Sequence, residues 1–429
     1  MVAISRFLIP LLSFLWITST VLCQGLPSAV PEDVGLSSER LNRISKVLQE
    51  FVDQKKISGM VTLVARHGKV AHLEAFGMKD IEAGEQMRVD TMFRIASMTK
   101  PVTAVAAMIL YEEGHFLLSD PISRYIPEFK NPRVLVPSSP GDVSSRAYTI
   151  VPAKSEITIL NLLNHTSGLT YGAGYLGEFY RDAGISNGLS STEGTIGDMV
   201  KKLAKLPLYH HPGEDATYGL SLDVLGYIVE IVSGIPLDRF FHERIFNPLD
   251  MNDTYFYPPE DKLHRVAALY ARNEKGGIDS QQERKIPSVL LGPRTYFAGG
   301  GGLVSTISDY ARFAQMLLNG GELDGVRLLS RKTVELMTTN SLGELYILKD
   351  YNDTRATHGD KYGLGLGIRT ERGDIESIGT FGWGGAFHTL FWVDPKEDMV
   401  GIFMSQLQAS GNLYQHKKFR ILAYQAIVD

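Results

Sequence analysis

The octapeptide at Phe93–Lys100 reads FRIASMTK, and the prediction of the fold depends on it more than on any other stretch. Ser97 and Lys100 are three residues apart, so on a helix they would lie on one face, within reach of each other. We expect Ser97 to open a helix that runs to about Glu113. Its hydroxyl would then lie among the unpaired N–H groups at the positive end of the helix dipole, which favours a developing oxyanion.

A serine followed three residues later by a lysine is a weak signal by itself, because a chain of this length contains it about once or twice by chance. Lys100 could accept the serine proton if it is neutral, which requires desolvation or a nearby positive charge. A second candidate nucleophile is Ser186 in the stretch Gly184–Gly188, which matches the G-x-S-x-G elbow. That motif needs a buried strand before it and a helix after it, and neither is indicated, so we interpret Ser186 as a loop serine.

Strand and helix patterns lie on both sides of the octapeptide. Apolar residues at helical spacing predict a helix after Ser37, and two apolar runs around His67 and Gly68 predict a β-hairpin. Strand-like runs return at 363–370, 388–393 and 399–404, with helices at 308–318 and 414–428. We therefore predict one α/β domain formed by both chain ends, residues 24–115 and 291–429.

The middle of the chain, residues 116–290, has short helices and many loops, and we predict an inserted helical domain there. Its best helix is Leu222–Val232, which ends at the stop signal Ser233–Pro236. Tyr218 directly precedes this helix. Near the C-terminus, Trp383–Ala386 lies where a strand begins that runs into Thr389–Val393. Glycines on a strand suit the close approach of a ligand.

Five segments, in this order, resemble the serine β-lactamase and penicillin-binding-protein family, and most closely its class C-like branch, which includes carboxylesterases and transesterases. The segments are Phe93–Lys100, Leu162–Leu169, Tyr218 with its helix, Gly300–Thr306 and Phe381–Pro395. Each is weak alone, but the ordered set is specific. The resemblance implies an α+β fold in which an antiparallel sheet is flanked by helices and carries a mainly helical insertion.

The resemblance also implies roles for particular residues. Ser97 is similar to the acylated nucleophile, Lys100 to its helper base, and Tyr218 to the tyrosine that passes protons to the leaving group. The backbone N–H groups of Ser97 and Ala386 would form the oxyanion hole. We expect substrate contacts from a further set of residues. This set comprises Trp383, Gly384, Gly385, Phe387 and Leu220, and strand alternation from Trp383 places Phe387 towards the site and His388 away from it.

Two departures from the family pattern bear on the substrate. Lactamases usually have Tyr-x-Asn, whereas Leu220 stands at the third position here. They also carry Lys-Thr-Gly on the strand, and Trp383 replaces that lysine with an indole, which favours an apolar or aromatic group. Both changes favour neutral esters, and the esterase and transesterase members have a similar Trp-Gly-Gly pattern. The prediction is a serine carboxylesterase.

Alternatives remain open at this stage. The chain could be a β-lactamase or a D-Ala-type peptidase or transesterase, or a binding module that keeps the fold without catalysis. The base could be a Tyr218 phenolate beside a positive Lys100, or a neutral Lys100. We expect His165 and Asn164 to have a structural role near the site. His210 and His211 lack further ligands at metal spacing, so we predict neither metal nor cofactor.

The composition and the N-terminal segment indicate the class of partner and the cellular location of the protein. The chain has 429 residues, 44% of them apolar, and a net charge of −5, which argues against a nucleic-acid partner. Arg6 and the apolar stretch that follows predict a signal peptide over residues 1–23, with a membrane anchor as the alternative. Cleavage would remove Cys23, the only cysteine, and would leave a secreted or periplasmic protein without disulfides or a stable membrane insertion. The expected partner is a small ester or lactam.

Overall fold

The computed structural model describes residues 25–137, 148–172, 174–189, 193–280, 288–347, 360–371, 374–408 and 413–429. The predicted signal peptide therefore lies outside the described residues. Within the described part of the chain, no helix is both long and apolar enough to cross a membrane.

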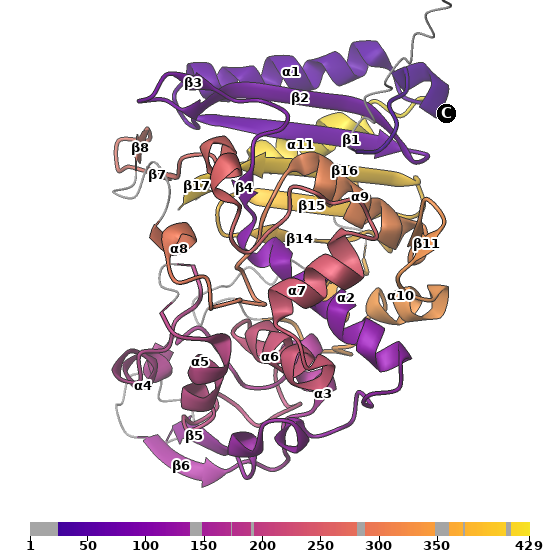
Figure 1. Ribbon diagram of the computed structural model, residues 1–429. Coiled ribbons are helices and arrows are strands. Elements are labelled where there is room, and N and C mark those ends of the chain that lie inside the picture. Colours follow the sequence, from indigo (N-terminus) through magenta and orange to yellow (C-terminus); the bar gives the residue numbers. More distant parts are fainter. Residues whose placement is uncertain are drawn as a thin grey trace, which may run out of the picture.

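An eight-stranded antiparallel sheet dominates the structure (Figure 1). Its strand order is β12-β13-β14-β15-β16-β1-β2-β3, so the C-terminal strand β16 lies next to the N-terminal strand β1. The predicted α+β class, with a sheet built by both chain ends, is thus confirmed. The strands are β1 (Gly59–Arg66), β2 (Lys69–Asp80), β3 (Glu85–Gln86), β12 (Asp360–Tyr362), β13 (Gly367–Arg369), β14 (Phe381–Gly385), β15 (Thr389–Asp394) and β16 (Met399–Ser405).

Helices cover both faces of this sheet, which explains why β1 is buried along its whole length. Along β1, Met60 and Val64 pack with α1 (Ser38–Asp53) and α11 (Gln415–Tyr424), whereas Val61, Leu63 and Ala65 pack with α2 (Thr99–Glu112) and α9 (Ile307–Leu318). This alternation follows from the two-residue period of a strand. Ser37 caps α1 by accepting the N–H of Arg40, as the sequence pattern predicts for a helix start.

The helical region lies below the sheet in Figure 1 and is joined to it by α2. It contains α3 (Ile159–Leu163), α4 (Gly177–Asp182), α5 (Ile196–Leu203), α6 (Ser221–Ser233) and α7 (Leu237–Phe241). One continuous hydrophobic cluster runs from Leu63 in the sheet through α2 to Leu225 in α6. The predicted insertion therefore has no separate core, and its boundaries at 116 and 290 stay a prediction.

Several short elements complete the described chain. They are α8 (Ser288–Leu291), α10 (Arg331–Met337), the pairs β4 (Phe93–Arg94) with β9 (Val304–Ser305), β5 (Arg133–Pro137) with β6 (Tyr148–Pro152) and β10 (Glu322–Leu323) with β11 (Val326–Arg327), and the small sheet of β7 (Tyr270–Arg272), β8 (Ile278–Ser280) and β17 (Leu407–Gln408).

The structure corrects two of the expected elements near the C-terminus. The run at 363–370 forms a strand only over β13, and Trp383–Val393 is not one strand but the hairpin of β14 and β15. The chain turns at residues 386–388, where His388 has a φ of 64°, in the left-handed region that a strand residue does not adopt. The pair Gly384–Gly385 directly before the turn was a turn signal in the sequence, and its interpretation as part of a strand missed it.

Candidate active site

Ser97 lies in a 3-10 turn, Ala96–Met98, that leads directly into α2. The chain enters this turn through Ala96, whose φ of 45° lies in the left-handed region. A non-glycine residue held there costs about 1–3 kcal/mol, so the surroundings must impose the conformation. Hydrogen bonds hold the chain on both sides of Ala96, since Ile95 donates its N–H to the Leu303 carbonyl at 3.0 Å and Tyr310 donates its hydroxyl to the Met98 carbonyl at 2.8 Å.

Lys100 is completely buried, and its Nζ has three oxygen acceptors. Ser97 Oγ lies at 3.3 Å, the Tyr171 hydroxyl at 2.8 Å and the Gly300 carbonyl at 2.5 Å. An ammonium group has three donors and no acceptor, so this arrangement suits protonated Lys100. Burial lowers the pKa of Lys100, but its electrostatic interactions with Tyr171, Tyr218 and Asp223 outweigh burial and raise this pKa above its ordinary value.

The Tyr218 ring, just before α6, packs against Lys100 Nζ. Its ring centroid is 4.7 Å from Lys100 Nζ, and its hydroxyl accepts a hydrogen bond of 3.0 Å from Trp383 Nε1. The Trp383 ring is 5.5 Å from the Tyr218 ring, and the buried His165 ring packs 4.7 Å from it. The indole N–H is thus donated to the Tyr218 oxygen, which can accept this hydrogen bond as a phenol or as a phenolate.

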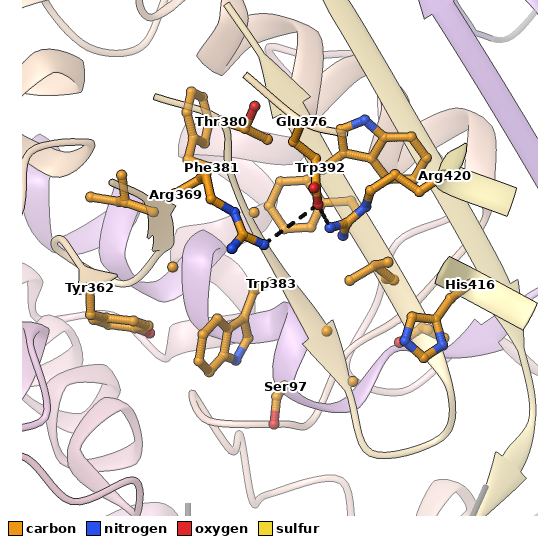
Figure 2. Close-up of a pocket in the computed structure, with 18 of the residues that line it drawn as sticks. Ser97, Tyr362, Arg369, Glu376, Thr380, Phe381, Trp383, Trp392, His416 and Arg420 are labelled. Atoms are coloured by element: carbon orange, nitrogen blue, oxygen red, sulfur yellow. Dashed lines mark ion pairs between the residues drawn. The ribbon is translucent and has the colours of Figure 1, made fainter. Parts of the chain in front are cut away.

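Ser97, Tyr218 and Trp383 line one cavity of about 630 Å³. Figure 2 shows Ser97 at one end, Trp383 above it, and the ion pairs of Glu376 with Arg369 and Arg420 further along the sheet. Gly384, Gly385 and Ala386 line the cavity between these ends. The structure thus brings together Ser97, Lys100 and Tyr218 with the predicted strand from Trp383 to Ala386.

The comparison with protein families identifies the fold and the chemistry. A family model described as "Beta-lactamase" matches residues 44–426. The chain belongs to the beta-lactamase family. It is a serine hydrolase with the beta-lactamase fold, and its family has both esterase and peptidase members.

Three relatives of this family member illustrate its range. It is 36% identical to "Protein Rv1367c" of Mycobacterium tuberculosis, over 84% of this chain and 88% of that protein. It is 30% identical to "Esterase EstB" of Burkholderia gladioli, over 82% of this chain and 86% of that protein. The solved structure of "EstCE1, a hydrolase with promiscuous acyltransferase activity" has a TM-score of 0.75 at 24% identity and covers 91% of this chain and 99% of that one, which shows the shared fold.

Two predicted substrate contacts are not in the cavity of this beta-lactamase family member. Leu220 is 1% exposed and packs in the core at the start of α6, so a substrate contact there does not fit the structure. Phe387 is buried against Ala96 and beneath the Arg94 guanidinium, 4.4 Å from its ring. His388 lines the cavity instead. The alternation argument was wrong because β14 ends at Gly385, before either residue.

The remaining residues singled out from the sequence are a loop serine, two buried histidines and a hydrogen-bonded asparagine. Ser186 lies in a loop, where its hydroxyl accepts the Gly188 N–H, as expected. Burial lowers the pKa of His388 to about 3 and lowers that of His165 well below its usual range, so both rings are neutral at pH 7. Asn164 accepts the N–H and the hydroxyl of Thr166.

The sequence analysis missed Tyr171 and Asp223. Tyr171 follows the family-like segment Leu162–Leu169 by two residues, and this closeness was the signal that could have identified it. Asp223 lies on the first turn of α6, where an acidic residue is ordinary, so nothing in the sequence distinguishes it.

Gly385 sets how closely β14 approaches the nucleophile. A Cβ added there would lie 2.3 Å from the Ile95 carbonyl oxygen and 2.2 Å from Thr389 Oγ1. We expect Gly385→Ala to push β14 away from Ser97 and to lower kcat about 100-fold, the usual effect of a displacement near 1 Å. Ester turnover and thermal melting should be measured together.

The neighbouring Gly384 provides the matched control for this substitution. A Cβ there would meet the Thr389 carbonyl at 3.3 Å and Leu390 Cδ1 at 3.6 Å, so Gly384→Ala should cost far less activity. Equal losses in the two variants would contradict the argument from close approach.

Proposed function

We propose that the protein is a carboxylesterase that hydrolyses neutral esters through an acyl-enzyme on Ser97. The observation that carries this proposal is the distance of 3.3 Å between Ser97 Oγ and Lys100 Nζ, beside Tyr218 and opposite an indole. The 30% identity to "Esterase EstB" supports an ester as the substrate.

The proposed reaction has two steps. Ser97 Oγ attacks the ester carbonyl, and its proton passes to the base formed by Lys100 and Tyr218. The bond to the alcohol breaks, and Tyr218 returns the proton to the alcohol oxygen. Water then attacks the acyl-Ser97 ester and gives a proton to the same base. The bond to Ser97 Oγ breaks, the base returns this proton to Oγ, and the carboxylic acid is released.

The oxyanion of each tetrahedral intermediate would bind the backbone N–H groups of Ser97 and Ala386. Ser97 lies at the start of the turn before α2, and Ala386 follows the last residue of β14. The close packing of Gly385 against the Ile95 carbonyl supports this pairing, because it holds the end of β14 beside the nucleophile. Each donor of this kind contributes about 2.7–4 kcal/mol to the reaction.

Trp383, Gly384 and Gly385 would contact the substrate. In lactamases a lysine at the position of Trp383 can attract a carboxylate, and an indole cannot. Trp383 also packs at 4.9 Å from the Tyr362 ring, so an aromatic wall lines the cavity near Ser97. An apolar or aromatic acyl or alkoxy group fits such a wall.

A substrate panel tests the proposal against a β-lactamase or a D-Ala-type peptidase. We expect the wild-type protein to hydrolyse nitrophenyl esters of neutral acids rapidly and a chromogenic cephalosporin slowly, since both share the acyl-enzyme. Rapid turnover of the cephalosporin with poor turnover of the esters would overturn the ester assignment. A fluorophosphonate probe that fails to label Ser97 would favour a non-catalytic binding protein.

The proposal includes export from the cell. Its support is the apolar segment after Arg6, which ends at Cys23.

A further inference from the structure

Asp223 is a buried carboxylate next to the site, and the mechanism above does not use it. It lies on the first turn of α6 with 1% of its surface exposed. Its Oδ1 accepts the Gly300 N–H at 3.0 Å. A Cβ added to Gly300 would lie 2.2 Å from Asp223 Oδ2, so the carboxylate is pressed against the Gly300 backbone. Oδ2 has no hydrogen-bond partner among the described residues.

Gly300 connects this carboxylate to Lys100. Its N–H points to Asp223, and its carbonyl accepts the 2.5 Å hydrogen bond from Lys100 Nζ. The preceding residue, Gly299, is also fixed, because Thr103 on α2 donates its hydroxyl to the Gly299 carbonyl at 2.6 Å. The segment therefore holds Asp223 and Lys100 on opposite sides of a single glycine.

The other acceptors of Lys100 are hydroxyl groups, from Ser97 and Tyr171, and these are neutral at rest. A buried ammonium needs a nearby negative charge, because the loss of hydration costs an unpaired ion a large free energy. The groups facing Asp223 are Lys100 on α2, Tyr171 after α3 and Tyr296 before β9. Lys100 is thus the cation that faces this carboxylate.

We propose that Asp223 is the buried counter-ion of Lys100, and that it keeps this lysine protonated throughout the reaction by acting across Gly300. Asp223 is then a positioning residue that touches no substrate. The inference rests on the proposed function, because it assumes that Lys100 serves Ser97. Its consequence is that Lys100 donates a hydrogen bond to Ser97 Oγ, while the proton of Ser97 goes to Tyr218, which then acts as the phenolate.

The charge of Asp223 depends on pH within the working range of most enzymes. Burial raises the pKa of this carboxyl group, whereas Lys100 and the Gly300 N–H lower it, and the balance is a pKa of about 6. Below pH 6 Asp223 becomes neutral and Lys100 loses its counter-ion. Above pH 6 the carboxylate is charged and the pair is complete.

The test is the pH dependence of kcat/KM for a nitrophenyl ester between pH 5 and about pH 10, in wild type and in Asp223→Asn. The asparagine oxygen can still accept the Gly300 N–H, so this variant removes the charge and leaves the hydrogen bond. In Asp223→Asn we expect the pKa of Lys100 to fall by about 3–5 units, the shift that full burial produces when no carboxylate opposes it. Activity should then fall on the alkaline side, where wild type stays active.

Asp309→Asn is the matched control. Asp309 is also 1% exposed, and burial raises its pKa to about 6. Its carboxylate, however, accepts hydrogen bonds from the Asp253 N–H and the Thr254 hydroxyl. We expect this variant to keep the wild-type pH profile. An unchanged profile in Asp223→Asn, or the same shift in Asp309→Asn, would overturn the inference.

Two further variants separate the charge from the fold. Asp223→Glu keeps the negative charge and should retain the alkaline activity of wild type, and a shifted profile in this variant would contradict the proposal. If Asp223→Asn does not fold, Asp223→Ser removes the charge with a smaller side chain and should show the same shift. Different results would refute the proposed function itself. In that case the wild-type protein would turn over no ester, or Ser97→Ala would remain active.

Discussion

Ser97→Ala is expected to lower ester turnover about 10⁴-fold or more, the usual result of removing a nucleophile from a site whose members act together. Ser97 Oγ is 3.3 Å from Lys100 Nζ and lines the 630 Å³ cavity. Alanine leaves the carbonyl carbon without an attacking oxygen, while the rest of the site stays in place. The measurement is kcat/KM for a nitrophenyl ester, together with mass spectrometry of the protein after brief exposure to substrate. Wild type should gain the mass of the acyl group, and the variant should not.

Ser186→Ala is the control for this experiment, because Ser186 belongs to the competing G-x-S-x-G match. Its hydroxyl accepts the Gly188 N–H in a loop, so the substitution should change turnover by no more than a few-fold. Normal turnover in folded Ser97→Ala would refute the nucleophile assignment. A large loss in Ser186→Ala would reopen the elbow hypothesis.

Tyr218→Phe is expected to lower kcat by about 10²–10⁴-fold, the range typical of a lost general acid or base. The ring would still pack against His165 and Trp383, but the hydroxyl that accepts the Trp383 N–H, and that we propose as the proton carrier, would be gone. Esters with poor leaving groups should suffer most, since their alcohols depend on protonation. Nitrophenyl esters, whose leaving group needs little protonation, should suffer least.

Tyr171→Phe is the matched substitution on the other tyrosine beside Lys100. It removes one hydrogen bond of 2.8 Å to Nζ, and a loss of about 10-fold, independent of the leaving group, is expected. If the two variants lost the same activity with the same dependence on leaving group, Tyr218 would have no special role in proton transfer.

Some parts of this site could be predicted from the sequence because they depend on local spacing. A serine and a lysine three residues apart face the same way on any helix, and the structure places them 3.3 Å apart. Tyr218, before α6, was recognisable through the family resemblance and not through spacing alone. The contribution of both chain ends to one sheet also followed from strand-like runs at both ends.

Other parts depend on contacts between distant segments, which a single sequence does not contain. Asp223 and Gly300 are 77 residues apart, and only packing of the Gly299–Gly300 segment against α6 brings them together. Phe387 and His388 exchanged places relative to the prediction because of one left-handed residue in a turn. Alternation predicts which side of a sheet a residue faces only while the strand continues.

The shared core has a consequence for engineering by recombination. Ser97 lies in the turn that leads into α2, Lys100 lies in the first turn of α2, and α2 packs on α6. The sheet and the helical region therefore cannot be exchanged separately between homologous enzymes. A crossover placed at residue 116 would join α2 of one parent to α6 of another and would mismatch their contact surfaces. Chimeras that inherit α2, α6 and the Gly299–Gly302 segment from the same parent should keep a functional site, and libraries are best designed around that block.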